Sequence, residues 1–306
     1  MDLNQTPPSP PAPPTPTAAG DGPCRVEVAE VATDAVTLLV CLCGLLGNGA
    51  VLWLLGLRIR RNPITVYILN LAVADFTFLL FMVALVSLYM VESVSCSLVV
   101  SLKYLRSPFL LSLFCYNMGL YLLTAISIER CVSVLCPLWY RCRRPQRLSA
   151  ALCVLLWALS IAVIAAVTSL CLWHEHEHCQ VALISMYLLN FLIFAPAMVI
   201  SNVILFIKVL CGSTRRQPKK LFIVIFLTIL FFLIFMLPLS IWNFLQQFSY
   251  ILVPSQVVFL LACINSSINP FIYFLVGSCR RRCSLVSLQD AFRRVFEETG
   301  VTTISS

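Results

Sequence analysis

Long apolar stretches separated by short polar segments dominate the chain from about residue 33 onward. A helix needs roughly 20 apolar residues to cross the hydrocarbon core of a bilayer. Stretches of that length lie near residues 33–57, 64–90, 103–136, 148–172, 181–209, 220–246 and 256–277. The third and fifth stretches require tilt or extension beyond the lipid. The pattern therefore predicts an all-α membrane protein, a bundle of seven transmembrane helices.

Three regions follow from this pattern. Residues 1–32 contain the run PPSPPAPPTP and no apolar core, so they are predicted to form a disordered, proline-rich extracellular segment without a signal peptide. Residues 33–277 form the predicted transmembrane domain. Residues 278–306 carry apolar residues at helical spacing between Leu285 and Phe296, which predicts an amphipathic helix on the inner leaflet and a cytosolic tail.

Basic residues are unevenly distributed between the two sides of the bundle. Of the 21 lysines and arginines, 18 lie in alternate loops, at the end of the third stretch or in the tail, and only Arg25, Lys103 and Arg106 lie on the other side. Cytosolic segments carry such an excess, so we expect a multi-pass protein of the plasma membrane with an extracellular N-terminus. The net charge of +8 is then a consequence of topology and does not indicate binding to nucleic acid.

Four of the 15 cysteines face the extracellular side, where disulfides form: Cys24, Cys96, Cys171 and Cys179. Cys171 and Cys179 bracket a tight turn between the fourth and fifth helices, which makes them the preferred disulfide. A bond between Cys24 and Cys96 is the second pairing considered. Asn4, in the run NQT, fits an N-glycosylation acceptor, although a proline follows.

All three histidines lie in the turn between the preferred disulfide cysteines, which reads LWHEHEHC. His174, His176 and His178 alternate with Glu175 and Glu177, an arrangement that suits zinc or copper binding or a response to mild acid. A solvated polar turn is the simpler interpretation. We predict no bound metal and no cofactor.

The tail adds candidates for modification. Cys279 and Cys283 lie beside the membrane and are candidates for palmitoylation, with unmodified thiols as the alternative. Serines and threonines between Thr299 and Ser306 form a candidate phosphorylation cluster.

Three polar residues lie at matched depth in three different helices. Asn48, Asp75 and Asn269 lie roughly 12–16 Å from the cytosolic ends of their helices, counted from the rise of an α-helix. Isolated polar groups are costly in hydrocarbon, so we expect these three to meet in one cluster, at the level where Pro270 frees backbone carbonyls. Asp75 either holds a cation or is a neutral, hydrogen-bonded structural residue.

The third stretch ends on the charged pair Glu129-Arg130. Charges at a membrane boundary are costly and favour a functional role, and an arginine that snorkels to the interface is the alternative. Pro196 and Pro238 interrupt the fifth and sixth helices, where each is either a hinge or a tolerated kink.

These motifs occur together in one known family. They are Asn48 in GN, Asp75 in LAVAD, Glu129-Arg130-Cys131, Trp157, Pro196, Pro238 and Asn269-Pro-Phe-Ile-Tyr273. With seven spans, they make the chain resemble a rhodopsin-like G-protein-coupled receptor over nearly its whole length. The segments GLYLLTAISIERCVSVLCPLWYRCRRP, RRNPITVYI and SSINPFIYFLVGS are similar to the Mas-related family of these receptors.

The resemblance implies a signalling mechanism. An extracellular peptide or small-molecule ligand favours a conformation in which the sixth helix swings outward and exposes a groove for a heterotrimeric G protein. The implied G-protein coupling residues are Glu129, Arg130, Cys131 and Tyr273. The implied sodium-like cluster is Asn48, Asp75, Asn265 and Asn269, with Gly119 replacing the usual serine of the third helix, and the implied activation hinges are Pro196, Phe232, Pro238 and Pro270. Arrestin and a receptor kinase are implied partners of the tail.

Several residues differ from those usual in rhodopsin-like receptors, and these differences agree with the resemblance to the Mas-related family. Leu105 occupies the position of the usual cysteine of the third helix, and Mas-related receptors use a bridge between the fourth and fifth helices instead, which supports the pair Cys171–Cys179. The sixth helix lacks the usual tryptophan, and its cytosolic start has no acid to pair with Arg130. The ionic lock of rhodopsin therefore cannot form, and we expect basal activity.

The absence of acidic residues at three positions limits the classes of ligand that the receptor is expected to bind. Ser112 stands where aminergic receptors have an aspartate, and Val167 and Leu183 stand where some Mas-related receptors carry acids for cationic ligands. A receptor with no dedicated ligand is the alternative. Candidates to line the external cavity, with ordinary helix packing as the alternative for each, are Tyr104, Phe109, Tyr116, Tyr187, Trp242, Asn243 and Gln246.

Other classes of membrane protein fit the sequence less well. Transporters and channels typically show internal repeats, broken helix pairs or charged pore residues. Metal-dependent membrane hydrolases need histidines within their spans. A protein that binds partners without signalling is harder to distinguish, but the intact Arg130 and NPFIY motif argue against it. We therefore predict a receptor and not an enzyme.

Overall fold

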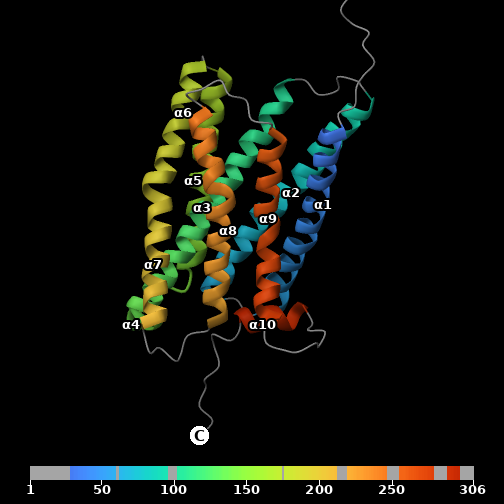
Figure 1. Cartoon of the computed structure of the whole chain (residues 1–306). Coiled ribbons are helices and arrows are strands. Elements are labelled where there is room, and N and C mark those ends of the chain that lie inside the picture. The colour runs from blue at the N-terminus through green and yellow to red at the C-terminus, as the bar shows by residue number, and fades with distance from the viewer. Residues whose placement is uncertain are drawn as a thin grey trace, which may run out of the picture.

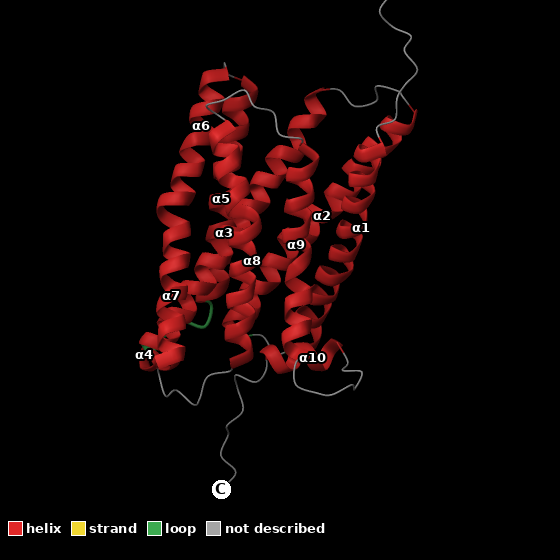
Figure 2. Ribbon diagram, viewed as in Figure 1, coloured by secondary structure: helices red, strands yellow, loops and turns green. Residues whose placement is uncertain are grey.

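The computed structural model describes residues 28–59, 62–95, 102–173, 176–211, 219–246, 255–278 and 288–296. Nearly all of these residues are helical, and none of them lies in a strand (Figure 2). The long helices run side by side in one bundle, and a short helix near the C-terminus lies across one end of it (Figure 1).

The helices match the predicted spans closely. The first three are α1 (Val28–Trp53), which continues as the π-helix η1 (Leu54–Arg58), α2 (Pro63–Ser95) and α3 (Leu102–Leu135). The next are α4 (Pro137–Cys142), α5 (Leu148–Trp173) and α6 (His176–Leu189), which continues through the π-helix η2 (Asn190–Phe194) into α7 (Ala195–Cys211). The last are α8 (Lys219–Gln246), α9 (Ser255–Ser278) and α10 (Leu288–Phe296).

Seven of the described helical segments are long and apolar enough to cross a membrane, with α6, η2 and α7 together forming the fifth. The predicted seven-helix bundle is therefore confirmed. Three local features were not predicted, and one of them is η1. The short helix α4 lies between the third and fourth spans, and η2 widens the helix immediately before Pro196, where a kink was expected.

The start of α2 explains how α10 is held. The Asn62 side-chain oxygen accepts hydrogen bonds from the backbone N–H groups of Ile64 and Thr65, so Asn62 caps the helix whose first residue is Pro63. The Asn62 amide then donates to the Phe296 carbonyl oxygen at 2.9 Å, at the last residue of α10. One asparagine therefore starts α2 and ties the end of α10 to it.

The predicted amphipathic helix is present as α10. Its apolar side chains Phe292, Val295 and Phe296 are buried, and both phenylalanine rings meet the Tyr273 ring of α9 edge-on. The two helices approach closely because Gly277 has no side chain, and a Cβ atom there would overlap the Ala291 carbonyl. The apolar face of α10 thus packs against the end of α9.

A second close approach brings α1 against α9. A Cβ atom on Gly44 would overlap the Ser267 hydroxyl oxygen and lie 2.7 Å from Cδ1 of Leu79. The same hydroxyl donates to the Val40 carbonyl oxygen at 3.1 Å. Small residues allow such contacts between membrane helices, where packing rather than water drives association.

We predict that Gly44→Ala destabilises the protein by roughly 1–3 kcal/mol, because the added methyl group forces α1 away from α9. Gly56→Ala is the matched control, since no atom lies within 4 Å of a Cβ atom at Gly56. We expect that change to be neutral or slightly stabilising, as for glycine replaced in a helix. Thermal unfolding of the two purified variants measures the difference, and equal midpoints would contradict the packing described for Gly44.

Candidate functional site

Glu129, near the end of α3, is the centre of a buried polar network. Its carboxylate accepts hydrogen bonds from the Tyr67 hydroxyl and the Tyr140 hydroxyl, each at 2.8 Å. Arg144 forms a salt bridge with it, with Nη2 at 2.5 Å from Oε1, and both side chains are less than a tenth exposed. The Ser149 hydroxyl lies 3.5 Å from the other carboxylate oxygen. Buried charges are tolerated when they are paired and hydrogen-bonded in this way.

The unpredicted helix α4 builds this network. Pro137 occupies its first turn, where a missing N–H costs nothing, and the helix carries Tyr140 over the end of α3. The Arg144 guanidinium lies 5.3 Å from the centre of the Tyr140 ring and also donates to the Ser149 hydroxyl. Burial, with the Glu129 charge adding to it, raises the pKa of Tyr140 to about 12. The Tyr140 hydroxyl therefore stays protonated and donating at neutral pH.

Arg130, the neighbour of Glu129 in the charged pair that ends α3, makes no salt bridge with it, although the Glu129 charge acts on Arg130 from beyond 4 Å. Arg144 occupies the carboxylate instead. The Arg130 Nε atom is buried and has no hydrogen-bond partner in the part of the chain that is described. Cys131, which follows it, is a buried free cysteine. Glu129 therefore has its salt bridge with an arginine from outside α3, because the segment between α4 and α5 supplies the competing guanidinium of Arg144.

The polar residues expected to cluster at one depth are brought together only in part. The Asn269 amide donates to Oδ2 of Asp75 at 3.0 Å. The Asn48 amide instead donates to two backbone carbonyls, those of Gly44 and Ser266, each at 3.0 Å. Asn265 makes no hydrogen bond to these groups within the described residues.

Asn48 satisfies a backbone carbonyl of α9 that Pro270 leaves without its helical hydrogen bond. Ser266 lies four residues before Pro270, so its carbonyl is the one that loses its helical partner to the proline. Its hydrogen bond from Asn48 replaces the missing one. Asn48 therefore supports the bend in α9 while Asn269 holds Asp75.

A chain of amides and hydroxyls between α3 and η2 was not predicted. The Asn190 amide donates to Oδ1 of Asn117 at 2.7 Å, and Oδ1 of Asn190 accepts from the Tyr121 hydroxyl at 3.1 Å. One turn further on, the Thr124 hydroxyl lies 3.2 Å from the Phe194 carbonyl oxygen. These contacts attach both ends of the π-helix to α3. Asparagines within apolar stretches were the available signal, since each needs a partner in hydrocarbon.

Phe232, one of the expected hinge residues, lies where α8 crosses α3. Its ring stacks on Tyr116, with centroids 5.9 Å apart and planes inclined by 11°. Its Cε2 atom lies 3.1 Å from where a Cβ atom of Gly119 would be. The missing serine of α3 thus leaves the space that the Phe232 ring fills. Of the other expected hinges, Pro196 is the second residue of α7 and Pro270 lies within α9. The side chain of Pro238 is not among those that the structure describes.

Two of the seven candidate ligand contacts can be placed. Tyr116 and Tyr187 are buried, and both line a cavity of about 310 Å³ between α3, the fifth span and α8. Tyr187 also packs in a hydrophobic cluster with Val167 and Leu183. The positions where some Mas-related receptors carry acids are therefore part of the apolar core here. The structure does not describe the side chains of the other five candidates, which are Tyr104, Phe109, Trp242, Asn243 and Gln246.

The structure joins Cys171 of α5 to Cys179 of α6 by a disulfide. Several other predicted features fall outside the described residues or side chains. They are Cys24, Cys96, Asn4, Cys279, Cys283, the phosphorylation cluster and most of the HEHEH turn. Within the described part of the chain, no three histidine, cysteine or acidic side chains group as metal ligands.

The comparison with known families covers the same motifs. Residues 47–273 match the sequence model described as 7 transmembrane receptor (rhodopsin family). The chain is 40% identical to Proto-oncogene Mas of Rattus norvegicus over 267 residues, which cover 83% of this chain and 80% of that protein. It is 42% identical to Mas-related G-protein coupled receptor member H of Rattus norvegicus over 283 residues, 90% of this chain and 86% of that protein. It is 40% identical to member D of Homo sapiens over 294 residues, 91% and 90% of the two chains.

We predict that Asn190→Leu destabilises the protein by roughly 1–3 kcal/mol, because it leaves the polar groups of Asn117 and Tyr121 buried without their partner. Tyr121→Phe removes one hydrogen bond of the same chain and is expected to cost about 0.5–1.5 kcal/mol. Thermal unfolding of wild type and both variants measures this order. A Tyr121→Phe protein less stable than Asn190→Leu would contradict the proposed connection.

Proposed function

This chain belongs to the rhodopsin family of seven-transmembrane receptors, among the relatives of Mas, and we propose that it couples to heterotrimeric G proteins through Arg130 with measurable activity in the absence of ligand. As a G-protein-coupled receptor it transmits the binding of an extracellular ligand to a G protein, and it is not an enzyme. The observation that carries the proposal is the salt bridge between Glu129 and Arg144. Among the described residues Arg130 makes no salt bridge of its own, although the Glu129 charge still acts on it from beyond 4 Å.

The proposed orientation has the N-terminus outside the cell and α4 and α10 on the cytosolic side of the plasma membrane. These two helices lie at the same end of the bundle (Figure 1). The basic residues of alternate loops flank that end, which is the distribution that cytosolic loops carry. Arg130 then lies on the side from which a G protein approaches.

Electrostatics favours the split arrangement of the two arginines. If Glu129 turned to Arg130, Arg144 would lose its carboxylate while less than a tenth exposed. Removing one partner from a buried ion pair typically costs about 3–5 kcal/mol. The helix α8 contains no acidic residue that takes the place of Glu129 as a partner of Arg130. No charge therefore holds α8 against α3 in the proposed resting state.

Outward movement of α8 is the proposed activating step, and packing rather than charge opposes it. The stacked pair Tyr116 and Phe232 and the close approach at Gly119 join α8 to α3. Tyr273 lies buried against Phe292 and Phe296, and we propose that it leaves this position to support the open groove. A ligand shifts this equilibrium only by binding the two states differently, and G-protein binding raises ligand affinity in return.

The remaining assignments rest on the resemblance. Asp75, which accepts a hydrogen bond from Asn269, is the proposed sodium-type site. Cys131, next to Arg130, is proposed to belong to the G-protein coupling residues. The ligand is proposed to be an extracellular peptide or small molecule that contacts Tyr116 and Tyr187, and a receptor with no dedicated ligand is the alternative. Arrestin and a receptor kinase are the proposed partners of the serine- and threonine-containing tail.

We predict that the wild-type receptor raises second-messenger output above that of mock-transfected cells without ligand, and that Arg130→Ala abolishes this increase. Arg130 is the group that the G protein engages in this proposal, so its loss removes coupling and leaves the fold intact. The two forms are compared at matched surface expression. Equal output from wild type and Arg130→Ala would contradict the role of Arg130.

We predict further that Arg144→Met lowers basal output, because Glu129 then turns to Arg130 as its remaining buried cation. In a Glu129→Gln background the same change is expected to have little effect, since no carboxylate is left to capture Arg130. The four forms make a double-mutant cycle measured by the same assay. Additive effects of the two substitutions would show that Arg144 does not act through Glu129.

A further inference from the structure

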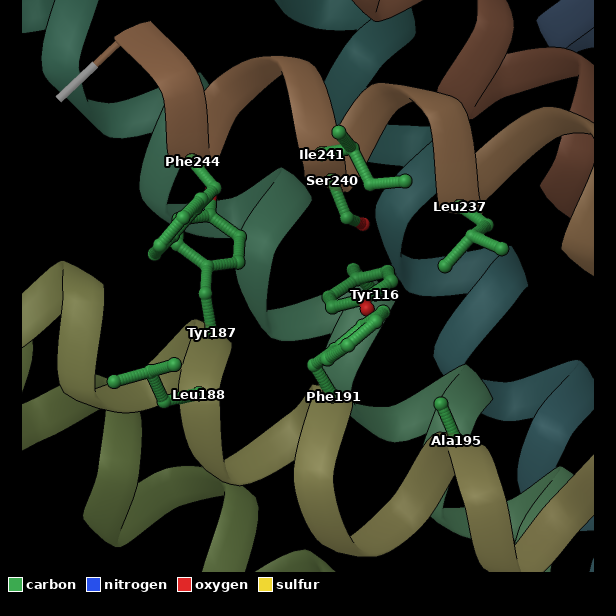
Figure 3. Close-up of a pocket in the computed structure, with 9 residues that line it drawn as sticks. All are labelled: Tyr116, Tyr187, Leu188, Phe191, Ala195, Leu237, Ser240, Ile241 and Phe244. Atoms are coloured by element: carbon green, nitrogen blue, oxygen red, sulfur yellow. The ribbon is translucent and has the colours of Figure 1, made fainter. Parts of the chain in front are cut away.

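The cavity lined by Tyr116 and Tyr187 opens sideways between the fifth span and α8. We call it the lateral cavity. Figure 3 shows Phe191 of η2 reaching towards Tyr116 of α3, with Ser240 and Ile241 projecting from α8. Its volume of about 310 Å³ lies at the lower end of the range for small-molecule sites, roughly 300–1,000 Å³. The space is therefore sufficient for a single narrow ligand.

The edge of the lateral cavity faces the bilayer. Leu188, Phe191 and Ile241 line it and are 43%, 57% and 45% exposed, respectively. In a transmembrane bundle, side chains exposed to this extent at these depths contact lipid chains and not water. A lipid tail therefore reaches the cavity directly, without passing through the extracellular face.

The interior carries polar groups but no charge. The nine described residues that line it include no acid, lysine, arginine or histidine. Ser240 projects from α8 towards Tyr116 (Figure 3), and its hydroxyl donates to the Met236 carbonyl oxygen at 2.7 Å. The Tyr116 side chain is also hydrogen-bonded to this hydroxyl, which has a second lone pair able to accept a hydrogen bond from a ligand. The chemistry suits one neutral polar group beside a hydrocarbon chain.

We propose that the lateral cavity binds a neutral single-chain lipid with one hydroxyl or amide group, which enters from the bilayer. The volume of about 310 Å³ suits one hydrocarbon chain, and the extracellular ligand proposed above would reach Tyr116 and Tyr187 from the other side of the bundle and compete with this lipid. The uncharged lining offers no partner to a carboxylate, a phosphate or an amine, each of which is costly to bury unpaired. This site is separate from the coupling through Arg130, so its test does not depend on signalling.

Selectivity at this site comes from shape and hydrogen bonding. A lipid tail that moves from the bilayer to an apolar cavity gains little hydrophobic free energy, because both surroundings are apolar. Contacts with the aromatic side chains and a hydrogen bond to Ser240 or Tyr116 therefore decide which lipid stays. A bound lipid also touches Tyr116, whose ring stacks on Phe232 of α8, so occupancy reaches the helix that moves on activation.

The test uses the full-length receptor in phospholipid nanodiscs and oleyl alcohol that carries a photoreactive diazirine in its chain. We expect labelling of peptides from η2 and the outer half of α8. Ile241→Trp, which fills the edge of the cavity, is expected to reduce this labelling about fivefold. Ile234→Trp is the matched control, since Ile234 is an exposed isoleucine two helical turns away that does not line the cavity.

The hydroxyl groups are tested by the double substitution Tyr116→Phe and Ser240→Ala. We expect this variant to lose about fivefold in labelling by the alcohol, as for the loss of one hydrogen bond in hydrocarbon. Labelling that is equal in the Ile241→Trp and Ile234→Trp receptors, or spread evenly over all lipid-facing helices, would overturn the proposed site.

Competition on the wild-type receptor keeps the test independent of how any variant folds. Unlabelled oleyl alcohol is expected to suppress the labelling saturably, while a phospholipid of the same chain and oleic acid at a pH where it is ionised are expected to have little effect. Equal competition by oleate would refute the neutral head group. Competition by the phospholipid would refute a single-chain ligand.

Discussion

Hydrocarbon offers no hydrogen bonds, so every polar group within the bundle must find its partner on a neighbouring helix or in its own backbone. This requirement fixes many of the contacts between spans. Asn48 of α1 serves the carbonyl that Pro270 frees in α9, and Asn190 of η2 serves two residues of α3. The tightest helix contacts follow from the same need. Gly44 brings α1 close enough to α9 for such bonds to form.

The same requirement governs the charges at the cytosolic end. A buried carboxylate needs a cation, and two arginines compete for Glu129. Arg144 wins because α4 holds Tyr140 beside it, so the carboxylate receives a guanidinium and two phenolic hydroxyls together. Arg130, the arginine proposed to engage the G protein, is then left without a salt bridge among the described residues. In the proposed mechanism, coupling through Arg130 therefore depends on the short helix α4, which lies between the third and fourth spans.

The sequence predicted the spans, α10, the family and the preferred cysteine pair, because each leaves a local pattern of apolar residues, spacing or motif. It did not predict α4, whose six residues are too few to show a period. It also did not predict η2, since a π-turn adds one residue to a helix without changing its apolar character. The partners of Glu129 and Asn48 depend on which helices meet, and that information lies in tertiary contacts.

The disulfide between Cys171 and Cys179 joins residues only eight positions apart. A loop that short removes little entropy from the unfolded chain, so the bond contributes less to global stability than one that closes a long loop. Its main consequence is local geometry. It holds the end of α5 against the start of α6, with the two Cα atoms 4.3 Å apart. Because position 105 of α3 is a leucine, no disulfide at that position ties α3 to this hairpin.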